Sequence, residues 1–203
     1  MKIFCIGRNY AEHARELQHE IPKEPVIFMK PKNALLLNNA PFYYPDFTVD
    51  LQYECEVVLR ICKNGRKVKE KFAHRYYNQL TVGIDFTARD LQARQKEKGL
   101  PWEIAKSFDH SAALGTLVDI GPEMDLSNLD FSLWKNDEKV QEGNTRDMLF
   151  SFNRLVSAIT QYFSINIGDF IYTGTPAGVG RVQIGDHLKA YLGDRCLLEF
   201  DIR

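Results

Sequence analysis

Two glutamates in the segment LQYECEVVL, residues 51–59, lie where a strand is expected to bury one of its faces. Side chains alternate between the two faces of a strand, so Glu54 and Glu56 share one face while Cys55 and Val57 occupy the other. Two carboxylates held this close repel each other, and a bound cation relieves the repulsion. A solvent-facing pair on an exposed strand is the simpler alternative, and the spacing alone favours it.

A third carboxylate, Asp85, ends the segment TVGID, which is expected to be a buried strand. A side chain at the end of a strand can reach into a cleft. With Glu54 and Glu56 it would offer three hard oxygen donors, which suit Mg²⁺, Mn²⁺ or Ca²⁺ better than a soft metal. Such a set leaves coordination positions for substrate and water. Because Asp85 stands far along the chain from both glutamates, the spacing does not decide whether the three meet.

The helix expected after Asp85 has the sequence ARDLQARQKEK and carries Arg89 and Gln92 on one face, because they are three residues apart. A guanidinium group can hold a carboxylate through two parallel hydrogen bonds. The pair therefore suits a carboxylated, keto-bearing ligand beside the proposed metal. The alternative is a solvated basic face, which periodicity alone favours and which consists of Arg89, Arg94, Lys96 and Lys98.

His13 and Glu16 are also three residues apart, in a polar segment, residues 8–20, that is expected to form a short helix. A carboxylate bonded to one ring nitrogen of a histidine fixes its tautomer and makes the other nitrogen more basic. The pair could thus be a base with its orienting acid, although a plain helix surface is the commoner arrangement. Lys106, in WEIAKSFD, is either a positioned cation or a lysine that extends to solvent from a strand edge.

The segment TGTPAGVG, residues 173–180, has the glycine content of a phosphate-binding loop but lacks the Gly-Lys-Ser/Thr ending of a nucleotide site. We expect its backbone N–H groups and the hydroxyls of Thr173 and Thr175 to bind a small anion.

The remaining elements needed to position these residues are mostly strands. Residues 53–68 have the pattern of a β-hairpin with a type I′ turn at Asn64-Gly65. Thr87 and Asp90 have the spacing of a capping box at the start of the helix. Residues 148–163 repeat apolar side chains at helical spacing, which is typical of a helix packed on a core or a subunit interface.

The bulk composition bounds the class of protein. The chain has 203 residues, of which 44% are hydrophobic, and a formal net charge of -1. We expect one domain, residues 1–203, with no overall field that would attract nucleic acid or an anionic membrane. The four cysteines form no C-x-x-C pair, and no segment has the length of a membrane span. A soluble, cytoplasmic protein with reduced thiols is expected.

Six segments in order resemble the fumarylacetoacetate hydrolase family, most closely its small single-domain acylpyruvase branch. They are GRNYAEHARE, VIFMKP, YECEVVL, GIDFTARDLQ, KGLPWEIAKSFD and YTGTPAGVG. Each is weak alone, but the ordered set is specific and covers nearly the whole chain. The resemblance implies an α+β, predominantly β fold, in which mixed β-sheets form the roll of the family's C-terminal domain with a few short helices. It also implies a homodimer.

The resemblance assigns roles to the residues already singled out. It implies that Glu54, Glu56 and Asp85 hold Mg²⁺ or Mn²⁺, and that His13 and Glu16 activate water from a short lid segment. The residues that it places in the substrate site, with Lys106 as a catalytic cation, are Arg89, Gln92, Lys106, Thr175 and, as a weaker candidate, Lys30.

These parts favour hydrolysis of a carbon–carbon bond in a small 2,4-dioxo acid such as an acylpyruvate. The metal would hold the carboxylate and 2-oxo oxygen, water activated by His13 would attack the 4-carbonyl, and Lys106 would stabilise the departing pyruvate enolate. Oxaloacetate decarboxylation reaches the same enolate without water and is the nearest alternative. A hydratase or isomerase of 2-oxo-alkenoates, and a non-catalytic binding protein stabilised by the metal, are further alternatives.

Overall fold

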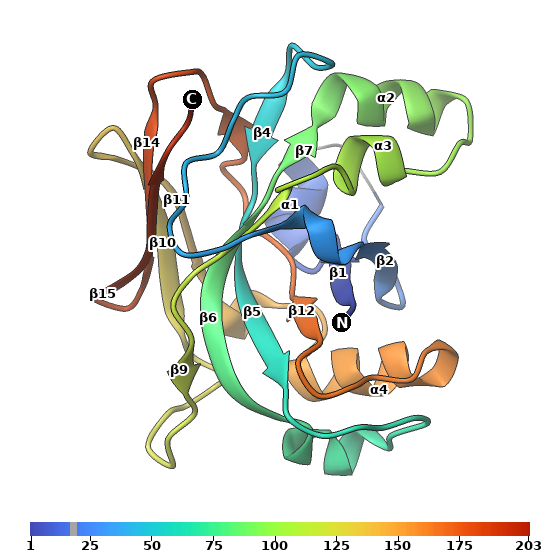
Figure 1. Ribbon diagram of the computed structural model, residues 1–203. Coiled ribbons are helices and arrows are strands. Elements are labelled where there is room, and N and C mark those ends of the chain that lie inside the picture. Colours follow the sequence, from blue (N-terminus) through green and yellow to red (C-terminus); the bar gives the residue numbers. More distant parts are fainter. Residues whose placement is uncertain (17–19) are drawn as a thin grey trace.

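The computed structural model describes residues 1–16 and 20–203, so the end of the helix expected at residues 8–20 lies outside the described residues. Within the described part, the chain is built mainly from strands arranged in three sheets, with short helices at their edges (Figure 1). The expected α+β, predominantly β class is confirmed.

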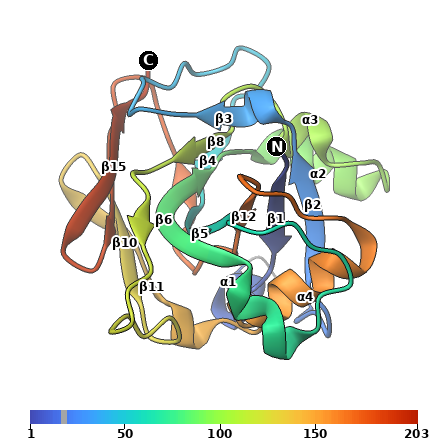
Figure 2. The same cartoon turned by 60° about the horizontal axis from the view of Figure 1, so that its bottom comes forward.

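The largest sheet within the described residues has eight strands and mixes parallel with antiparallel pairing. In spatial order its strands are β2 (Val26–Lys30), β1 (Ile3–Gly7), β12 (Phe170–Tyr172), β5 (Cys55–Ile61), β6 (Tyr77–Asp85), β8 (Ala112–Leu114) and β3 (Leu35–Leu36), with β9 (Val118–Asp119) paired to β6. Figure 2 shows that β6 and β5 curve strongly, so that the sheet rolls around the centre of the molecule.

Two smaller sheets complete the roll. One consists of β11 (Glu138–Asn144), β10 (Asp130–Lys135), β14 (His187–Leu192) and β15 (Arg195–Asp201), and the other of β13 (Gly180–Arg181), β4 (Leu51–Tyr53) and β7 (Thr87–Ala88). Figure 2 places β10, β11 and β15 together on one side of β6.

The α-helices are α1 (Ala11–Glu16), α2 (Arg89–Glu97), α3 (Glu103–Lys106) and α4 (Phe152–Tyr162), and the short 3₁₀ helices are η1 (Lys32–Ala34), η2 (Glu70–Arg75) and η3 (Thr145–Asp147). In Figure 1, α2 and α3 lie side by side next to β4 and β7. None of the described helices combines the length and apolar character needed to cross a membrane.

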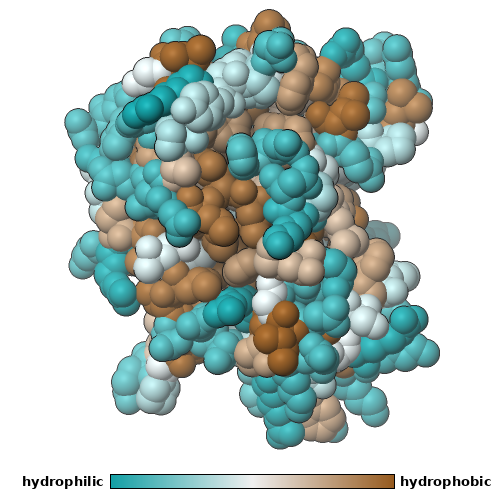
Figure 3. Space-filling model, in the orientation of Figure 1, coloured by the Kyte–Doolittle hydropathy of each residue, from teal (hydrophilic) through white to brown (hydrophobic). Residues whose placement is uncertain are grey.

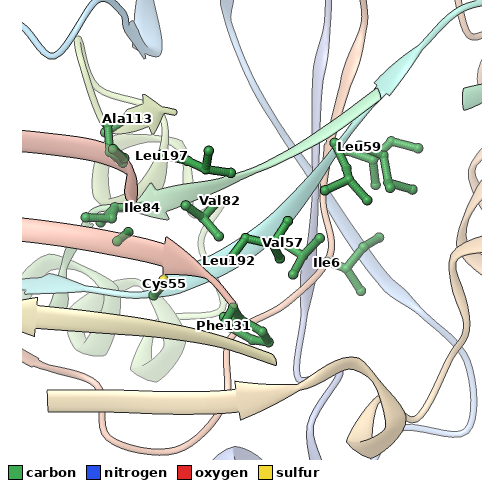
Figure 4. Close-up of a cluster of buried hydrophobic side chains, with 14 of the residues drawn as sticks. Ile6, Cys55, Val57, Leu59, Val82, Ile84, Ala113, Phe131, Leu192 and Leu197 are labelled. Atoms are coloured by element: carbon green, nitrogen blue, oxygen red, sulfur yellow. The ribbon is translucent and has the colours of Figure 1, made fainter. Parts of the chain in front are cut away.

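The main core fills the space between the large sheet and the four-stranded sheet. Figure 4 shows Val57 and Leu59 of β5, Val82 and Ile84 of β6, and Phe131 of β10 converging there. These strand residues stand at alternate positions, as side chains that share one face of a sheet must. The buried stripe of α4 joins the same core, so the apolar spacing at residues 148–163 is that of a core helix.

The opposite face of the large sheet carries a second, smaller apolar cluster, which includes Ile3, Cys5, Val58 and Tyr172. Alternation puts Glu56, two residues before Val58, on this second face. The glutamates singled out from the sequence therefore lie on the side of the sheet away from the main core.

Two of the expected local structures are wrong. The partner of β5 is β6, and Asn64-Gly65 makes no two-residue turn between them. Instead Gly65 exchanges backbone hydrogen bonds of 2.9 and 3.0 Å with Ile165, and Asn64 Oδ1 accepts one from the N–H of Ile167. Glycine is needed at position 65 because a Cβ there would lie 2.5 Å from the ring of Tyr76.

The capping box at Thr87 is also absent. Thr87 belongs to strand β7, and α2 begins at Arg89 after Ala88 without a side-chain cap. The Asp90 carboxylate accepts a hydrogen bond from the Thr48 hydroxyl, so it anchors the loop before β4. Pairing of β7 with β4 has overridden the local capping signal.

Candidate active site

The structure brings the three carboxylates together. Glu54, Glu56 and Asp85 each offer an oxygen, these oxygens lie within 4.8 Å of one another, and all three residues are buried. The cause is the register of β5 and β6, which pairs Glu56 with Gly83 and therefore brings Glu54 opposite Asp85. The Asp85 N–H accordingly donates to the Glu54 carbonyl at 2.8 Å. Asp85 therefore joins the two glutamates that strand alternation was expected to place side by side.

The carboxylates also lie where two strands leave the large sheet. Glu54 separates β4 from β5, and Phe86 separates β6 from β7. At these two residues the backbone passes between the eight-stranded and the three-stranded sheet. Backbone that changes sheet opens a gap in which side chains are not covered by a neighbouring strand. That gap holds the acidic cluster.

The donor set fits Mg²⁺ or Mn²⁺. Carboxylate oxygens are the hard ligands that these cations take. One of them, Asp85 Oδ1, is buried without a hydrogen bond. Lys30 Nζ lies 2.7 Å from this oxygen, but its hydrogen bonds go to the Ser111 hydroxyl and to backbone carbonyls, so the contact is an ion pair without hydrogen-bond geometry. The oxygen therefore keeps a lone pair for a metal.

Lys106 is a positioned cation, and the alternative of a lysine extended to solvent is wrong. Its side chain is 4% exposed, and its Nζ lies 2.7 Å from Glu54 Oε2 and 2.9 Å from Asp85 Oδ2. The ammonium also lies 5.3 Å from the centre of the Phe28 ring. The four-residue helix α3 ends at Lys106 and carries it to the acidic cluster.

The guanidinium group of Arg89 is hydrogen-bonded to side chains of the protein and does not extend into solvent. Its guanidinium donates to Glu54 Oε1 at 2.6 Å, to Gln92 Oε1 at 2.8 Å and to Gln52 Oε1 at 2.9 Å. Arg94 and Lys98 of the same region are exposed, so the solvated basic face exists but excludes Arg89. Arg89 and Gln92 fix the orientation of Glu54, and a direct contact with substrate stays a prediction.

The charges of the cluster shift one another's proton affinities in opposite directions. Burial opposes ionisation of Glu54, but Lys106 and Arg89 outweigh it and hold the pKa of this carboxyl well below its ordinary value. Burial, followed by repulsion from Asp85 and Glu54, raises the pKa of Glu56 well above its ordinary value. Burial alone would lower the pKa of Lys106, but Asp85 and Glu54 raise it. Two glutamates on one face thus have opposite tendencies to hold a proton.

The His13 and Glu16 pair forms as expected. His13 Nδ1 lies 3.2 Å from Glu16 Oε2, and His13 is buried where α1 faces the acidic cluster. The Glu16 carboxylate also accepts from the Gly178 N–H, at 3.1 and 3.3 Å to its two oxygens. Glu16 is therefore anchored to the glycine-rich loop, and its contact with Nδ1 leaves Nε2 of His13 for chemistry.

The glycine-rich loop binds anions, but they are the protein's own carboxylates. The Gly174 N–H donates to Glu56 Oε2 at 2.6 Å, as the Gly178 N–H does to Glu16. The hydroxyls of Thr173 and Thr175 donate to the backbone carbonyls of Val57 and Cys55. Each of these donors is used within the protein, and binding of a small anion by this loop stays a prediction.

Thr175 and Lys30, both predicted for the substrate site, have different positions. Thr175 lines the cavity above the carboxylates, while its hydroxyl also accepts from Gln141 Nε2 at 3.0 Å. Lys30 is not among the cavity-lining residues and supports Asp85 and the backbone carbonyl of Lys106 from within the protein. A role in substrate binding stays a prediction for both.

The cavity over the carboxylates is small, about 30 Å³. Sequence reasoning missed six lining residues, which are Ile6, Gly7, Arg8, Phe28, Lys96 and Trp102. Lys96 could have been found, because it continues the helical row of Arg89 and Gln92, whereas no local pattern identifies Arg8.

Two buried amides that hold the site together were also missed. Asn9 donates to the carbonyls of Phe150 and Thr173, and its Oδ1 accepts from the N–H of Phe150. Gln141 accepts from the N–H of Cys55 and donates to Thr175 and to the carbonyl of Pro176. Their partners lie far away along the chain, so no motif could reveal them.

Comparison with known proteins agrees with this geometry. The family model described as fumarylacetoacetate (FAA) hydrolase C-terminal matches residues 2–202. A mitochondrial oxaloacetate tautomerase from Arabidopsis thaliana is 40% identical over 201 residues, covering 99% of this chain and 90% of that protein. A mitochondrial oxaloacetate decarboxylase from Dictyostelium discoideum is 36% identical over 203 residues, covering 99% of this chain and 93% of its own length.

Among solved structures, the fumarylpyruvate hydrolase from Pseudomonas aeruginosa, in complex with Mn²⁺ and pyruvate, superposes with a TM-score of 0.94. The two chains are 34% identical, and the alignment covers 100% of this chain and 89% of the other. The match of fold, the buried acidic cluster and the sequence identity lead to one conclusion. The chain belongs to the fumarylacetoacetate hydrolase family.

Proposed function

We propose that this protein is a divalent-metal-dependent enzyme that acts on oxaloacetate through its enolate, as a tautomerase or decarboxylase. The observation that carries the proposal is the placement of Lys106 and His13 on one cavity with the three carboxylates. Lys106 supplies a fixed positive charge, and His13 supplies a base. The names of the relatives at 36–40% identity support oxaloacetate over the acylpyruvates that the sequence alone favoured.

Glu54, Glu56 and Asp85 would hold Mg²⁺ or Mn²⁺, which supplies a Lewis acid for the carboxylate and 2-oxo oxygen of the substrate. Arg89 and Gln92 orient Glu54, and the Gly174 N–H orients Glu56. The ammonium of Lys106, already at the carboxylates, stabilises negative charge that develops on the 2-oxo oxygen.

His13 supplies the proton transfers. In tautomerisation a proton leaves C3 of the keto form and another is added to the 2-oxo oxygen, and Nε2 of His13 is the free ring nitrogen that can accept or return it. Glu16 holds the ring through Nδ1. In decarboxylation the electrons of the C3–C4 bond move toward the 2-oxo group as CO₂ leaves, and C3 then takes up a proton. Neither reaction needs an attacking water.

Hydrolysis of acylpyruvates is the second candidate. The oriented pair of His13 and Glu16 is suited to activating water, and a fumarylpyruvate hydrolase has the same fold at 34% identity. The variant His13→Ala separates the reactions. If it abolishes cleavage of acetylpyruvate but leaves oxaloacetate decarboxylation intact, His13 serves water activation; equal loss of both would contradict that division.

The test of the proposed function is a side-by-side assay of oxaloacetate, acetylpyruvate and fumarylacetoacetate after chelation and after Mg²⁺ or Mn²⁺ is restored. Keto–enol conversion and pyruvate release are followed separately. Metal-dependent turnover of oxaloacetate that exceeds turnover of both dioxo acids supports the proposal. Faster release from a dioxo acid would favour the hydrolase, and no turnover of any acid with metal-induced stabilisation would favour a non-catalytic protein.

We further propose that the protein forms a homodimer in solution. Tyr43, Val49 and Ile184 are well exposed apolar side chains, and apolar residues gather near the middle of the face in Figure 3. Light scattering tests the oligomeric state. A cytoplasmic location also stays a proposal, whereas the names of the tautomerase and decarboxylase relatives say mitochondrial.

A further inference from the structure

Two basic residues line the cavity without a part in the chemistry described above. Arg8 follows β1 directly and has a left-handed backbone, with φ of 61°. Lys96 lies on α2 one turn beyond Gln92, so the row of Arg89, Gln92 and Lys96 faces the cavity along one side of the helix.

The charges around the cavity are unbalanced. Its described lining includes the four cations Arg8, Arg89, Lys96 and Lys106 and three acids. Arg89 and Lys106 form ion pairs with Glu54, and Lys106 also with Asp85. Arg8 has no acidic partner among the residues that the structure describes. A divalent cation on the three carboxylates would increase the positive excess further.

Lys96 lies close to the other cations of the cavity. Burial, then the charges of Arg89 and Arg8, lower the pKa of Lys96 to about 8. Its Nζ lies 5.5 Å from the centre of the Trp102 ring, and Trp102 packs edge-on against Phe28 at 6.0 Å. The ammonium is therefore kept against an aromatic wall that also lines the cavity.

We propose that Arg8 and Lys96 bind the second carboxylate of a dicarboxylic 2-oxo acid and so select dianions over acids with a neutral distal end. The inference rests on the proposed function, because it takes the first carboxylate and the 2-oxo group to be held at the acidic cluster. Charge-assisted hydrogen bonds to a carboxylate in a water-poor site are strong, and they are lost when the distal group is a ketone.

Oxaloacetate and acetylpyruvate make a matched pair of substrates, because the distal carboxylate of the first is replaced by an acetyl group in the second. The variants are Arg8→Gln and Lys96→Gln, with Arg94→Gln and Lys98→Gln as controls on exposed positions of the same region. We expect each cavity variant to raise KM for oxaloacetate by about tenfold or more, with a smaller change in kcat. KM for acetylpyruvate should change by less than about threefold, and the controls should match the wild type.

Pyruvate, which lacks the distal carboxylate, serves as the probe of the remaining site. Its inhibition constant should stay the same in all variants if only the distal contact is lost. An equal loss of affinity for oxaloacetate, acetylpyruvate and pyruvate would overturn the inference while leaving the proposed function standing. An unchanged KM for oxaloacetate in both variants would do the same.

If the wild type turns over neither substrate, the proposed function fails, and the inference is decided by binding. In the Mg²⁺-loaded protein, oxaloacetate should raise the melting temperature more than pyruvate does, and Lys96→Gln should remove that difference. Equal stabilisation of the wild type by the two ligands would overturn the inference as well.

Discussion

Two hollows of the molecule differ in size and, in the opposite order, in how deeply their charged side chains are buried. An open groove of about 580 Å³ crosses the four-stranded sheet and is lined by Trp134, Lys139, Lys189 and Tyr191, among others. The cavity at the acidic cluster measures only about 30 Å³. Volume alone would direct attention to the groove.

The charges of the two hollows explain why the smaller one is the candidate site. In the groove, Lys139 and Glu142 form an ion pair at 3.1 Å with side chains 40% and 69% exposed, where water screens the attraction. In the cavity, Lys106 contacts Glu54 and Asp85 at 2.7 and 2.9 Å, with all three side chains nearly inaccessible. Removal of charge from water, rather than empty volume, produces shifted pKa values and metal affinity.

The largest expected effect comes from removing one carboxylate from each hollow. Asp85→Asn should lower kcat/KM with oxaloacetate by about a thousandfold, because it removes a proposed metal ligand and one of the two carboxylates that contact Lys106. Asp137→Asn, which changes an exposed acid of the groove, should leave it within a factor of about two. Steady-state kinetics with Mg²⁺ measure both, and a comparable loss in the two variants would erase the distinction between the hollows.

Two glycines at positive φ, Gly174 beside the acidic cluster and Gly193 in the groove, provide a matched test of stability. A Cβ at Gly174 would lie 2.6 Å from the Cβ of Asn9, and φ there is 104°, so Gly174→Ala should cost about 3 kcal/mol or more and displace the amide that binds Glu56. Gly193 has φ of 54° and open space around its Cβ, so Gly193→Ala should cost about 1 kcal/mol. Urea unfolding measures both. Similar costs would mean that the loop at Gly174 adjusts freely.

The raised pKa of Glu56 predicts how metal binding depends on pH. In the metal-free protein Glu56 keeps its proton at pH values above 4.5, its ordinary pKa. The stability linked to that proton is therefore present below pH 4.5 and is lost as pH rises through the folded pKa. A metal must displace this proton. The rise in melting temperature on adding Mg²⁺ should therefore grow as pH rises above 4.5 toward the folded pKa, and a constant rise would contradict a protonated Glu56.

The smallest expected effect belongs to an exposed charge cluster on the four-stranded sheet. Hydrogen bonds to Asp201 and Glu199, at 2.7 and 2.9 Å, raise the pKa of His187. The contribution of His187 to stability is therefore full at pH values below 6.5, its ordinary pKa, and is lost as pH rises through the folded pKa. His187→Gln should cost less than about 1 kcal/mol at pH 5.5 and nothing measurable at pH 9. Thermal unfolding at the two pH values checks this, and a cost above that of Gly193→Ala would be unexpected.

Strand alternation and the order of motifs were enough to predict the fold class and the residues of the acidic cluster. Glu54 and Glu56 follow from a period of two within one strand, and His13 with Glu16 follows from helical spacing. The meeting of Asp85 with Glu54 depends on the register of two strands, which a sequence motif does not specify.

Predictions failed where distant partners outweighed local signals. Gly65 pairs with Ile165 across a hundred residues and not with its neighbours, and Thr87 is taken up by pairing with Gln52. Arg8 shows the same limitation for function, because its place in the cavity depends on the juxtaposition of β1 and α2.

We propose that the acidic cluster holds a metal that enolises a small 2-oxo acid. The most direct measurement is the rate at which the enol of oxaloacetate converts to the keto form, followed by its absorbance, in wild type and Asp85→Asn with Mg²⁺ or after chelation. We expect a large rate enhancement that needs both the metal and Asp85. An enhancement that survives chelation, or that Asp85→Asn retains in full, would contradict it.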